Sequence, residues 1–191
     1  MLRIFAAVIF CMLWLPGPAT ADELADRTKA AEDLAGAGKF LDAMDALDDA
    51  ATLVWDRAPL TFRKALWVAE TPAGFGAYNP RETNEYAAGD EMIAYVEPVG
   101  FGWRKSGDMW QTDLAADVSI KDKDGKEIFS QKDFQKLALS SRVRNHEFMT
   151  RFTFTLTGLP AGTYTLETTL RDAISSKSGS FALPFAIKGA Q

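Results

Sequence analysis

The sequence predicts a mainly β protein, an antiparallel β-sandwich preceded by an N-terminal α-helical hairpin. After residue 60, apolar and polar residues alternate with a period of two through several runs, whereas residues 22–57 are rich in Ala, Leu and Asp and contain no Pro. A period of two is typical of strands with one solvated face. The 191 residues are 47% hydrophobic and 25% charged with one Cys, which excludes a disordered chain or a disulfide scaffold.

The first 21 residues have the pattern of a secretory signal peptide. Arg3 precedes an apolar run over residues 4–15, and Ala-Thr-Ala at 19–21 forms a cleavage site with small residues. The apolar run is shorter than the roughly 17–25 residues that a membrane-spanning helix needs. We therefore expect cleavage after Ala21, a mature chain without a membrane span, and a periplasmic or secreted location.

Residues 22–58 are expected to form two antiparallel helices, the first from Glu23 to Ala35. Gly36-Ala37-Gly38 supplies the break, because Gly accepts the left-handed conformation that ends a helix. The apolar face predicted for the second helix consists of Phe40, Ala43, Met44, Leu47, Ala51 and Val54. Residues 38–50 resemble the middle of a tetratricopeptide repeat, but the chain contains one copy only, so a solenoid is not expected.

Residues 59–191 are expected to form the β-sandwich. The runs that predict strands are 62–68, 91–96, 114–120, 152–156, 164–170 and 181–187. Residues 91–96 are apolar on both faces, as expected of a central strand. Asp124-Gly125 is a hairpin turn signal, and Pro184 indicates that the last strand lies at an edge or carries a bulge.

The segment Gly158-Leu-Pro-Ala-Gly-Thr-Tyr-Thr-Leu166, followed by a final strand, resembles the C-terminal half of immunoglobulin-like and fibronectin-type domains. The wider pattern over about residues 65–190 is similar to uncharacterised exported bacterial proteins with one such sandwich. The resemblance implies an antiparallel immunoglobulin-like β-sandwich. It implies no activity, because one fold hosts many functions.

The sequence contains no recognised catalytic motif. His146 is the one histidine, no Gly-x-Ser-x-Gly presents a nucleophile, and the acidic residues of 122–127 lack the full set of a calcium loop. We therefore expect a non-enzymatic protein with no cofactor and no metal. An enzyme with carboxylates brought together from distant positions is an alternative. The net charge of −5 makes nucleic acid an unexpected partner.

Residues 97–110 are expected to form a long loop with exposed aromatic and basic side chains. The predicted ligand-binding residues are Tyr78, Phe101, Trp103, Arg104 and Trp110. Flat rings give a large contact area at low entropy cost, so this set suits an envelope protein or, alternatively, a glycan bound by a carbohydrate-binding module. In a third interpretation the tryptophans only fold the loop onto the sandwich.

Acidic residues follow the polar face of the second helix. Asp42, Asp45 and Asp49 form this row, and Asp56 extends it. Residues 22–58 hold ten acidic and four basic residues, whereas 59–191 hold 16 of each. The row indicates either a solvated surface or a docking face for a basic partner.

Overall fold

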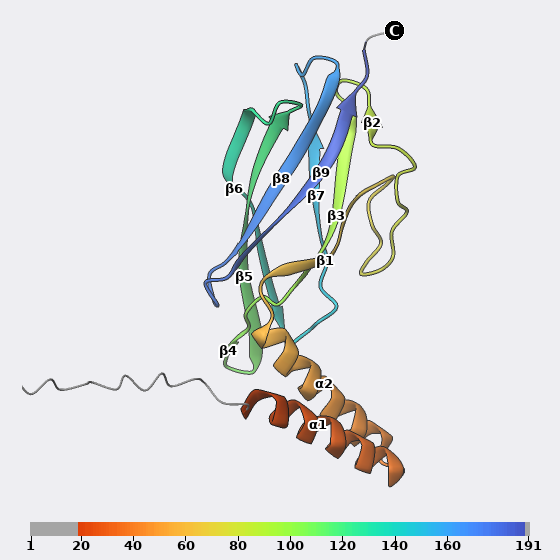
Figure 1. Ribbon diagram of the computed structural model, residues 1–191, viewed down its shortest axis with the longest axis vertical. Helices are drawn as coiled ribbons and strands as arrows, with labels where there is room; N and C mark the ends of the chain where they lie inside the picture. The colour runs from red at the N-terminus through yellow and green to blue at the C-terminus, as the bar shows by residue number, and fades with distance from the viewer. Residues whose placement is uncertain (1–18, 190–191) are drawn as a thin grey trace, which may run out of the picture. The chain divides into compact units, whose positions relative to one another are not determined.

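The computed structural model describes residues 19–189, which divide into two compact units, one ending at Leu53 and one beginning at Val54. The protein is mainly β, with two N-terminal helices and antiparallel sheets (Figure 1), which confirms these parts of the predicted fold. The division falls inside the second helix, before the boundary predicted at residue 58. Within the described range, no helix has the length and apolarity to cross a membrane. The predicted signal peptide lies mostly outside the described residues.

The N-terminal unit is a helical hairpin. Its helices are α1 (Ala19–Gly36) and α2 (Phe40–Arg57), so α1 begins before the predicted Glu23. Gly38 has a φ of 74°, and the Lys39 amide donates to the Leu34 carbonyl oxygen at 3.0 Å. This left-handed residue ends α1 and reverses the chain, as predicted from the Gly-Ala-Gly break.

The apolar face predicted for α2 is largely exposed. Among residues 22–53, the buried positions are Ala31 of α1 and Ala43 and Ala50 of α2, whereas Phe40 and Met44 are each 64% exposed. The large side chains of this face stay exposed because the two helices approach through alanines, one row to the side. A single neighbouring helix covers only one stripe of α2, and the seam of small residues lies on that stripe.

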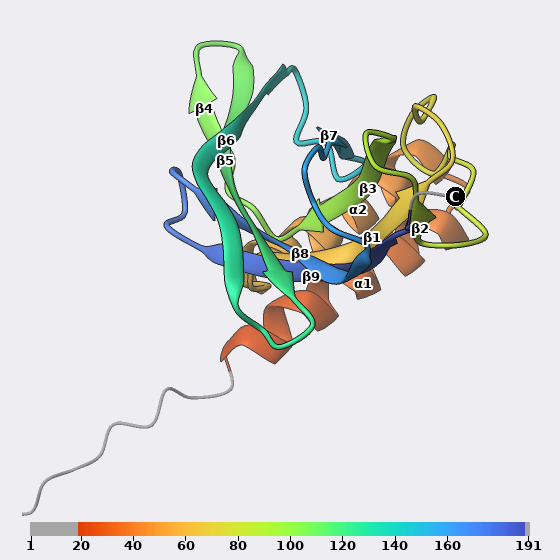
Figure 2. The same ribbon diagram turned by 90° about the horizontal axis from the view of Figure 1, so that it is seen from above.

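The second unit contains two sheets. Its strands are β1 (Thr61–Val68), β2 (Glu85–Tyr86), β3 (Glu91–Val99), β4 (Arg104–Ser106), β5 (Met109–Asp122), β6 (Glu127–Ser141), β7 (Thr150–Thr155), β8 (Gly162–Asp172) and β9 (Ser178–Ile187). One sheet has the order β1-β3-β7; the other has the order β2-β9-β8-β5-β4, with β6 also paired to β5. All pairs are antiparallel except β2 with β9. Seen from above, β5 and β6 form a long curved ribbon (Figure 2).

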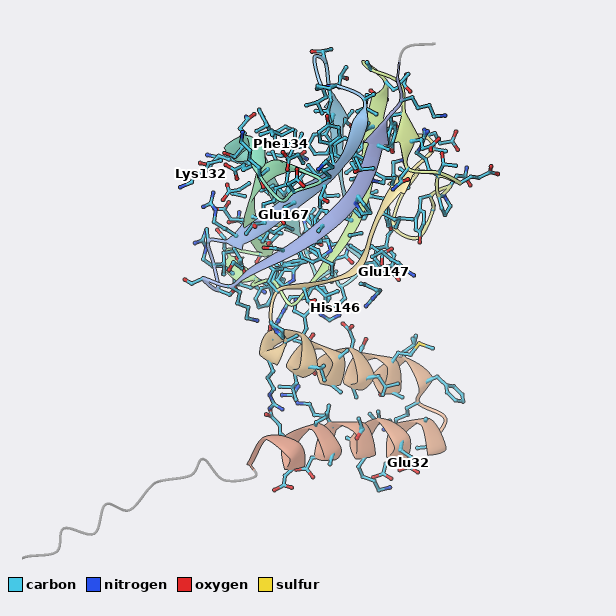
Figure 3. All side chains as sticks on the ribbon, turned by 45° about the horizontal axis from the view of Figure 1, so that its top comes forward. Glu32, Lys132, Phe134, His146, Glu147 and Glu167 are labelled. Carbon is cyan, nitrogen blue, oxygen red and sulfur yellow. The ribbon has the colours of Figure 1, made fainter. Side chains whose placement is uncertain are left out.

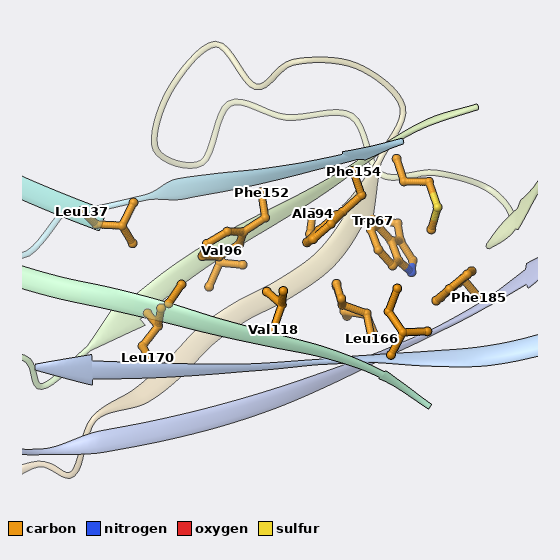
Figure 4. Packing of buried hydrophobic residues seen from close by; sticks show 14 of the residues in the cluster. Trp67, Ala94, Val96, Val118, Leu137, Phe152, Phe154, Leu166, Leu170 and Phe185 are labelled. Atoms are coloured by element: carbon orange, nitrogen blue, oxygen red, sulfur yellow. The ribbon is translucent and has the colours of Figure 1, made fainter. Parts of the chain in front are cut away.

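One apolar core joins the two sheets (Figure 4). Val96 and Phe152 from the three-stranded sheet belong to the same buried cluster as Val118, Leu166 and Phe185 from the larger sheet. The central strand β3 also buries its opposite face, where Ile93 and Tyr95 pack with Val68. The prediction that residues 91–96 form a central strand is therefore confirmed.

A bulge changes the faces of β1. The register shifts between Phe62 and Lys64, and Trp67 rather than Leu66 enters the main core. A strict period of two over the predicted run 62–68 would place Phe62, Leu66 and Val68 on one face. It fails because one extra residue in a strand reverses the orientation of every side chain beyond it.

Most of residues 97–110 belong to strands and not to a loop. The strand β3 continues to Val99, and β4 pairs with the start of β5 as a hairpin with Gly107 at φ 58°. The expected long loop is reduced to residues 100–103, which are held close to the core. Of the predicted binding residues, Arg104 and Trp110 therefore lie on strands and Phe101 and Trp103 in this short connection, whereas Tyr78 lies between β1 and β2.

Candidate binding surfaces

Phe101 is a core residue. Its side chain is completely buried, and its ring meets those of Trp55 and Phe148 at centroid distances of 5.0 and 5.3 Å. The prediction that Phe101 is an exposed binding residue was wrong. The preceding Gly100, with φ of 82°, turns the chain toward the core against the Pro59 carbonyl, where a Cβ atom would not fit.

Trp103 follows Phe101 and is half-buried. Its ring lies 5.5 Å from the Phe101 ring, and its Nε1 is buried without a hydrogen-bond partner in the described part of the chain. The Gly102 amide between them donates to Asp172 Oδ2 at 2.6 Å. Residues 101–103 are thus fixed onto the β unit, in agreement with the interpretation in which the aromatic residues fold this segment down.

Trp110 is half-buried at the start of β5, beside two cations. Lys105 Nζ and Arg144 Cζ lie over its ring at 5.1 and 5.3 Å from the centroid. Arg144 also forms a short ion pair with Asp56. Because the ring already has cationic partners, the arrangement does not favour the alternative in which this tryptophan stacks on a sugar.

Tyr78 and Arg104 do not join a common site. The half-buried Tyr78 ring lies 4.2 Å from the ring of Tyr95, on the face of β3 opposite the main core. Arg104 is exposed on β4, where its backbone pairs with Gln111. The five residues predicted as one binding set are therefore divided among the core, two strands and the opposite face of the small sheet.

The last turn of α2, which belongs to the β unit, is held by contacts that the sequence pattern did not reveal. Trp55 is buried, donates from Nε1 to the Phe101 carbonyl oxygen at 2.8 Å, and stacks on His146 with the ring centroids 4.7 Å apart. Lys177 Nζ donates to the carbonyl oxygens of Asp56, Ala58 and Gly100 at 2.8, 2.7 and 2.8 Å. The one histidine of the chain thus packs against an indole in a structural cluster.

Three carboxylates of the β unit are engaged in structural contacts. The buried Asp172 accepts from the Gly102 and Ile174 amides, and Arg171 bridges Asp117 and Asp133. The hydrogen bonds from Arg171 lower the pKa of the Asp117 carboxyl below its usual value. Within residues 19–189, no three His, Cys, Asp or Glu side chains lie close enough together to hold a metal ion.

An apolar cleft of about 440 Å³ opens between β6 and β7. It is lined by Ile120, Ile128, Phe129, Phe134, Thr153, Phe154, Thr155, Leu156, Thr157 and Leu159. Phe134 projects from β6 (Figure 3) and stacks on Phe154 at 5.1 Å. The cleft lies where the free edges of the two sheets, β6 and β7, face each other.

The helical hairpin presents an apolar row beside an acidic one. Phe40, Leu41, Met44 and Leu47 are 64, 77, 64 and 52% exposed. Asp42, Asp45 and Asp49 are also exposed, and of these three only Asp49 forms an ion pair with a described residue, Arg27, at 3.8 Å. No large apolar side chain of residues 97–110 is exposed to this degree. The hairpin is therefore a stronger candidate for a binding surface than the predicted aromatic loop.

No protein-family model matches the sequence, and no curated protein matches it. Three solved structures share limited similarity: the Pseudomonas fluorescens alkylpurine DNA glycosylase AlkC bound to DNA containing an abasic site analog (10% identity, TM-score 0.38), the sporulation control protein of Bacillus subtilis (13%, 0.33), and a Paenibacillus cycloisomaltooligosaccharide glucanotransferase complexed with cycloisomaltoheptaose (14%, 0.31). The matches cover 73, 70 and 58% of this chain. They span only 33, 51 and 13% of those proteins.

Proposed function

We propose that this protein is an exported, non-enzymatic binding or assembly module of the cell envelope, and that its helical hairpin docks on a partner protein. The observation that carries the proposal is the row of large apolar side chains exposed on α2. Apolar surface of this kind, bordered by charged residues, is typical of a protein-interaction site. The predicted signal peptide supports the location, and the row replaces the aromatic loop as the expected contact surface.

We further propose that the β unit is an immunoglobulin-like sandwich. In that fold the strands A, B and E lie together in one sheet and C, F and G in the other. Assigned in chain order, β1, β3 and β7 take the places of A, B and E, and β5, β8 and β9 take those of C, F and G. The Tyr164 hydroxyl near the start of β8 donates to the Pro160 carbonyl oxygen at 2.8 Å, which corresponds to the tyrosine corner of this fold.

Position-specific photo-cross-linking in the source cells tests the proposed docking face. A photo-reactive amino acid replaces Met44 in one variant and the exposed Val143 of the β unit in a matched control. We expect Met44 to cross-link to one discrete envelope protein and Val143 to give no such product. Equal cross-linking from both positions, or none from Met44 at normal expression, would contradict the proposal.

A further inference from the structure

We propose that the partner presents a basic amphipathic helix, which packs along α2 on the row formed by Phe40, Leu41, Met44 and Leu47. This inference rests on the proposed function and specifies the chemistry of the partner. Three features of the hairpin carry it: the spacing of the apolar side chains, the face of α2 that α1 leaves uncovered, and the charge beside that face.

The apolar row has the dimensions of a helix-packing surface. Phe40, Met44 and Leu47 lie at i, i+4 and i+7 on one side of α2, and Leu41 borders them three residues before Met44. Ala51, at i+11, continues this side over a third turn. Rows of this spacing form the ridges that fit into the grooves of a second helix. Helical partners are commonly recognised in this way, through an apolar face laid against apolar side chains.

The hairpin leaves this face open because α1 covers a different one. Ala43 and Ala50 meet the seam with α1 and are 5 and 4% exposed, whereas Leu41 remains 77% exposed. A helix pair that cannot bury its apolar face alone gains stability when another helical element covers it. Burial of these side chains by one more helix would remove the apolar surface that the hairpin exposes to water.

The acidic residues beside the apolar row favour a basic partner helix. Asp42, Asp45 and Asp49 follow the adjacent face, and the only base within α2 is Arg57 in its last turn. Asp42 and Asp45 form no ion pair with any residue in the described range 19–189. A second copy of this hairpin would place acidic residues against acidic residues, which is unfavourable. Lys and Arg flanking the apolar face of a partner helix would complement the row and guide its approach.

Three synthetic peptides test the inference by fluorescence anisotropy with the purified protein. Each is about 18 residues long, or five helical turns, and shares one leucine face with Lys, Gln or Glu on the polar face. We expect the Lys peptide to bind roughly tenfold more tightly than the Glu peptide, and added salt to reduce the difference. Equal binding of all three would overturn the basic character of the partner.

Two sets of variants locate the binding site. Leu41→Ser with Met44→Ser should abolish binding of the Lys peptide, whereas Val143→Ser, which also removes an exposed apolar side chain, should not change it. Asp42→Asn, Asp45→Asn and Asp49→Asn together should weaken binding roughly tenfold and remove its salt dependence. The matched control is Asp108→Asn, Asp113→Asn and Asp124→Asn on exposed positions of the β unit. Circular dichroism verifies that each variant is folded.

The remaining outcomes separate this inference from the proposed function. Sedimentation velocity should show a monomer, and a concentration-dependent dimer abolished by Met44→Ser would assign the face to a second copy. If Met44 cross-links to an envelope protein but the Lys peptide does not bind, the docking face stands and the basic helix is wrong. If neither occurs, both proposals fail.

Discussion

The indole Nε1 of Trp67 donates a 2.9 Å hydrogen bond to the carbonyl oxygen of Pro184, and so connects the two sheets. Asn84 Nδ2 donates to the same oxygen at 3.1 Å. Pro184 has no amide hydrogen, and the neighbouring β2 pairs only with Ala186 and Ile187. Most of β9 therefore has no strand on one side, in agreement with the edge position that Pro184 predicted. The side chains of Trp67 and Asn84 donate to the carbonyl oxygen of Pro184 in place of a neighbouring strand.

Replacing Trp67 by Phe should lower the free energy of unfolding by about 1–3 kcal/mol. The substitution keeps an aromatic ring in the core but removes the donor to Pro184 and part of the buried ring volume. Urea denaturation measures the change. Trp103→Phe is the control, since the Nε1 of that residue has no hydrogen-bond partner in the described chain. An equal loss in the control would show that ring volume alone decides the result.

Lys177→Met should destabilise the β unit by about 2–3 kcal/mol. The side chain keeps its length and apolar stem, but the carbonyl oxygens of Asp56, Ala58 and Gly100 lose a charged donor. Thermal unfolding followed by circular dichroism measures the loss. Lys136→Met removes an exposed lysine from β6 and should change the stability little. A stability for Lys177→Met equal to that of this control would refute the structural role.

Tyr164→Phe should cost about 1 kcal/mol of unfolding free energy. The hydroxyl bond to Pro160 holds the turn that enters β8, and its loss removes one hydrogen bond without a change of packing. Chemical denaturation provides the measurement. Tyr78→Phe retains the ring contact with Tyr95, and the Tyr78 hydroxyl forms no hydrogen bond within residues 19–189, so the stability should stay within a few tenths of a kcal/mol.

Gly179→Ala should destabilise the protein by about 2 kcal/mol or more. A Cβ atom at this position would collide with the backbone carbonyl oxygen of Leu60, which cannot move without displacing the chain before β1. Gly36→Ala is a matched change at a helical position with open space around it, and we expect it to be neutral or slightly stabilising. Melting temperatures of the two variants test the difference, and similar values would be inconsistent with the close approach.

The strands were predictable where alternation is regular and were mispredicted where a bulge interrupts it. The runs within β5, β7 and β8 have the predicted faces, since each strand alternates over its core-facing part. No run predicted β6, in which Asp133 has a φ of 50° at a register irregularity between Val118 and Ala116 of β5. A period of two cannot be recognised across a position that breaks it.

The candidate surfaces were less predictable, because exposure depends on what covers a residue. The composition of residues 97–110 indicates aromatic side chains but does not distinguish the buried Phe101 from the half-buried Trp110. The helical pattern of α2 likewise identifies an apolar face without showing that α1 packs on another one. Lys177 could not be found from sequence, since its three acceptors are backbone carbonyls far away in the chain.

Alkaline pH should destabilise the protein through two buried tyrosines. Burial raises the pKa of Tyr86 to about 12. The pKa of Tyr95 is also raised to about 12. Burial is the larger cause, and the hydrogen bond that Tyr95 donates to Glu97 is the second. In the unfolded chain both phenols ionise near their ordinary pKa of about 10. Their contribution to stability is therefore complete below about pH 10 and is lost as the pH rises toward about 12.

Spectrophotometric titration of tyrosinate and denaturation at increasing pH together test this expectation. The native protein should complete its tyrosine ionisation only on unfolding or near pH 12, whereas the guanidinium-unfolded chain should titrate near its ordinary value of about 10. Tyr86→Phe retains the ring and removes a hydroxyl that has no hydrogen-bond partner in the described residues, so it should reduce the alkaline loss of stability. Complete ionisation of all four tyrosines near pH 10 in the folded protein would contradict the burial of these two phenols. A phenol that is exposed to water ionises near its ordinary pKa, whereas burial disfavours the charged form.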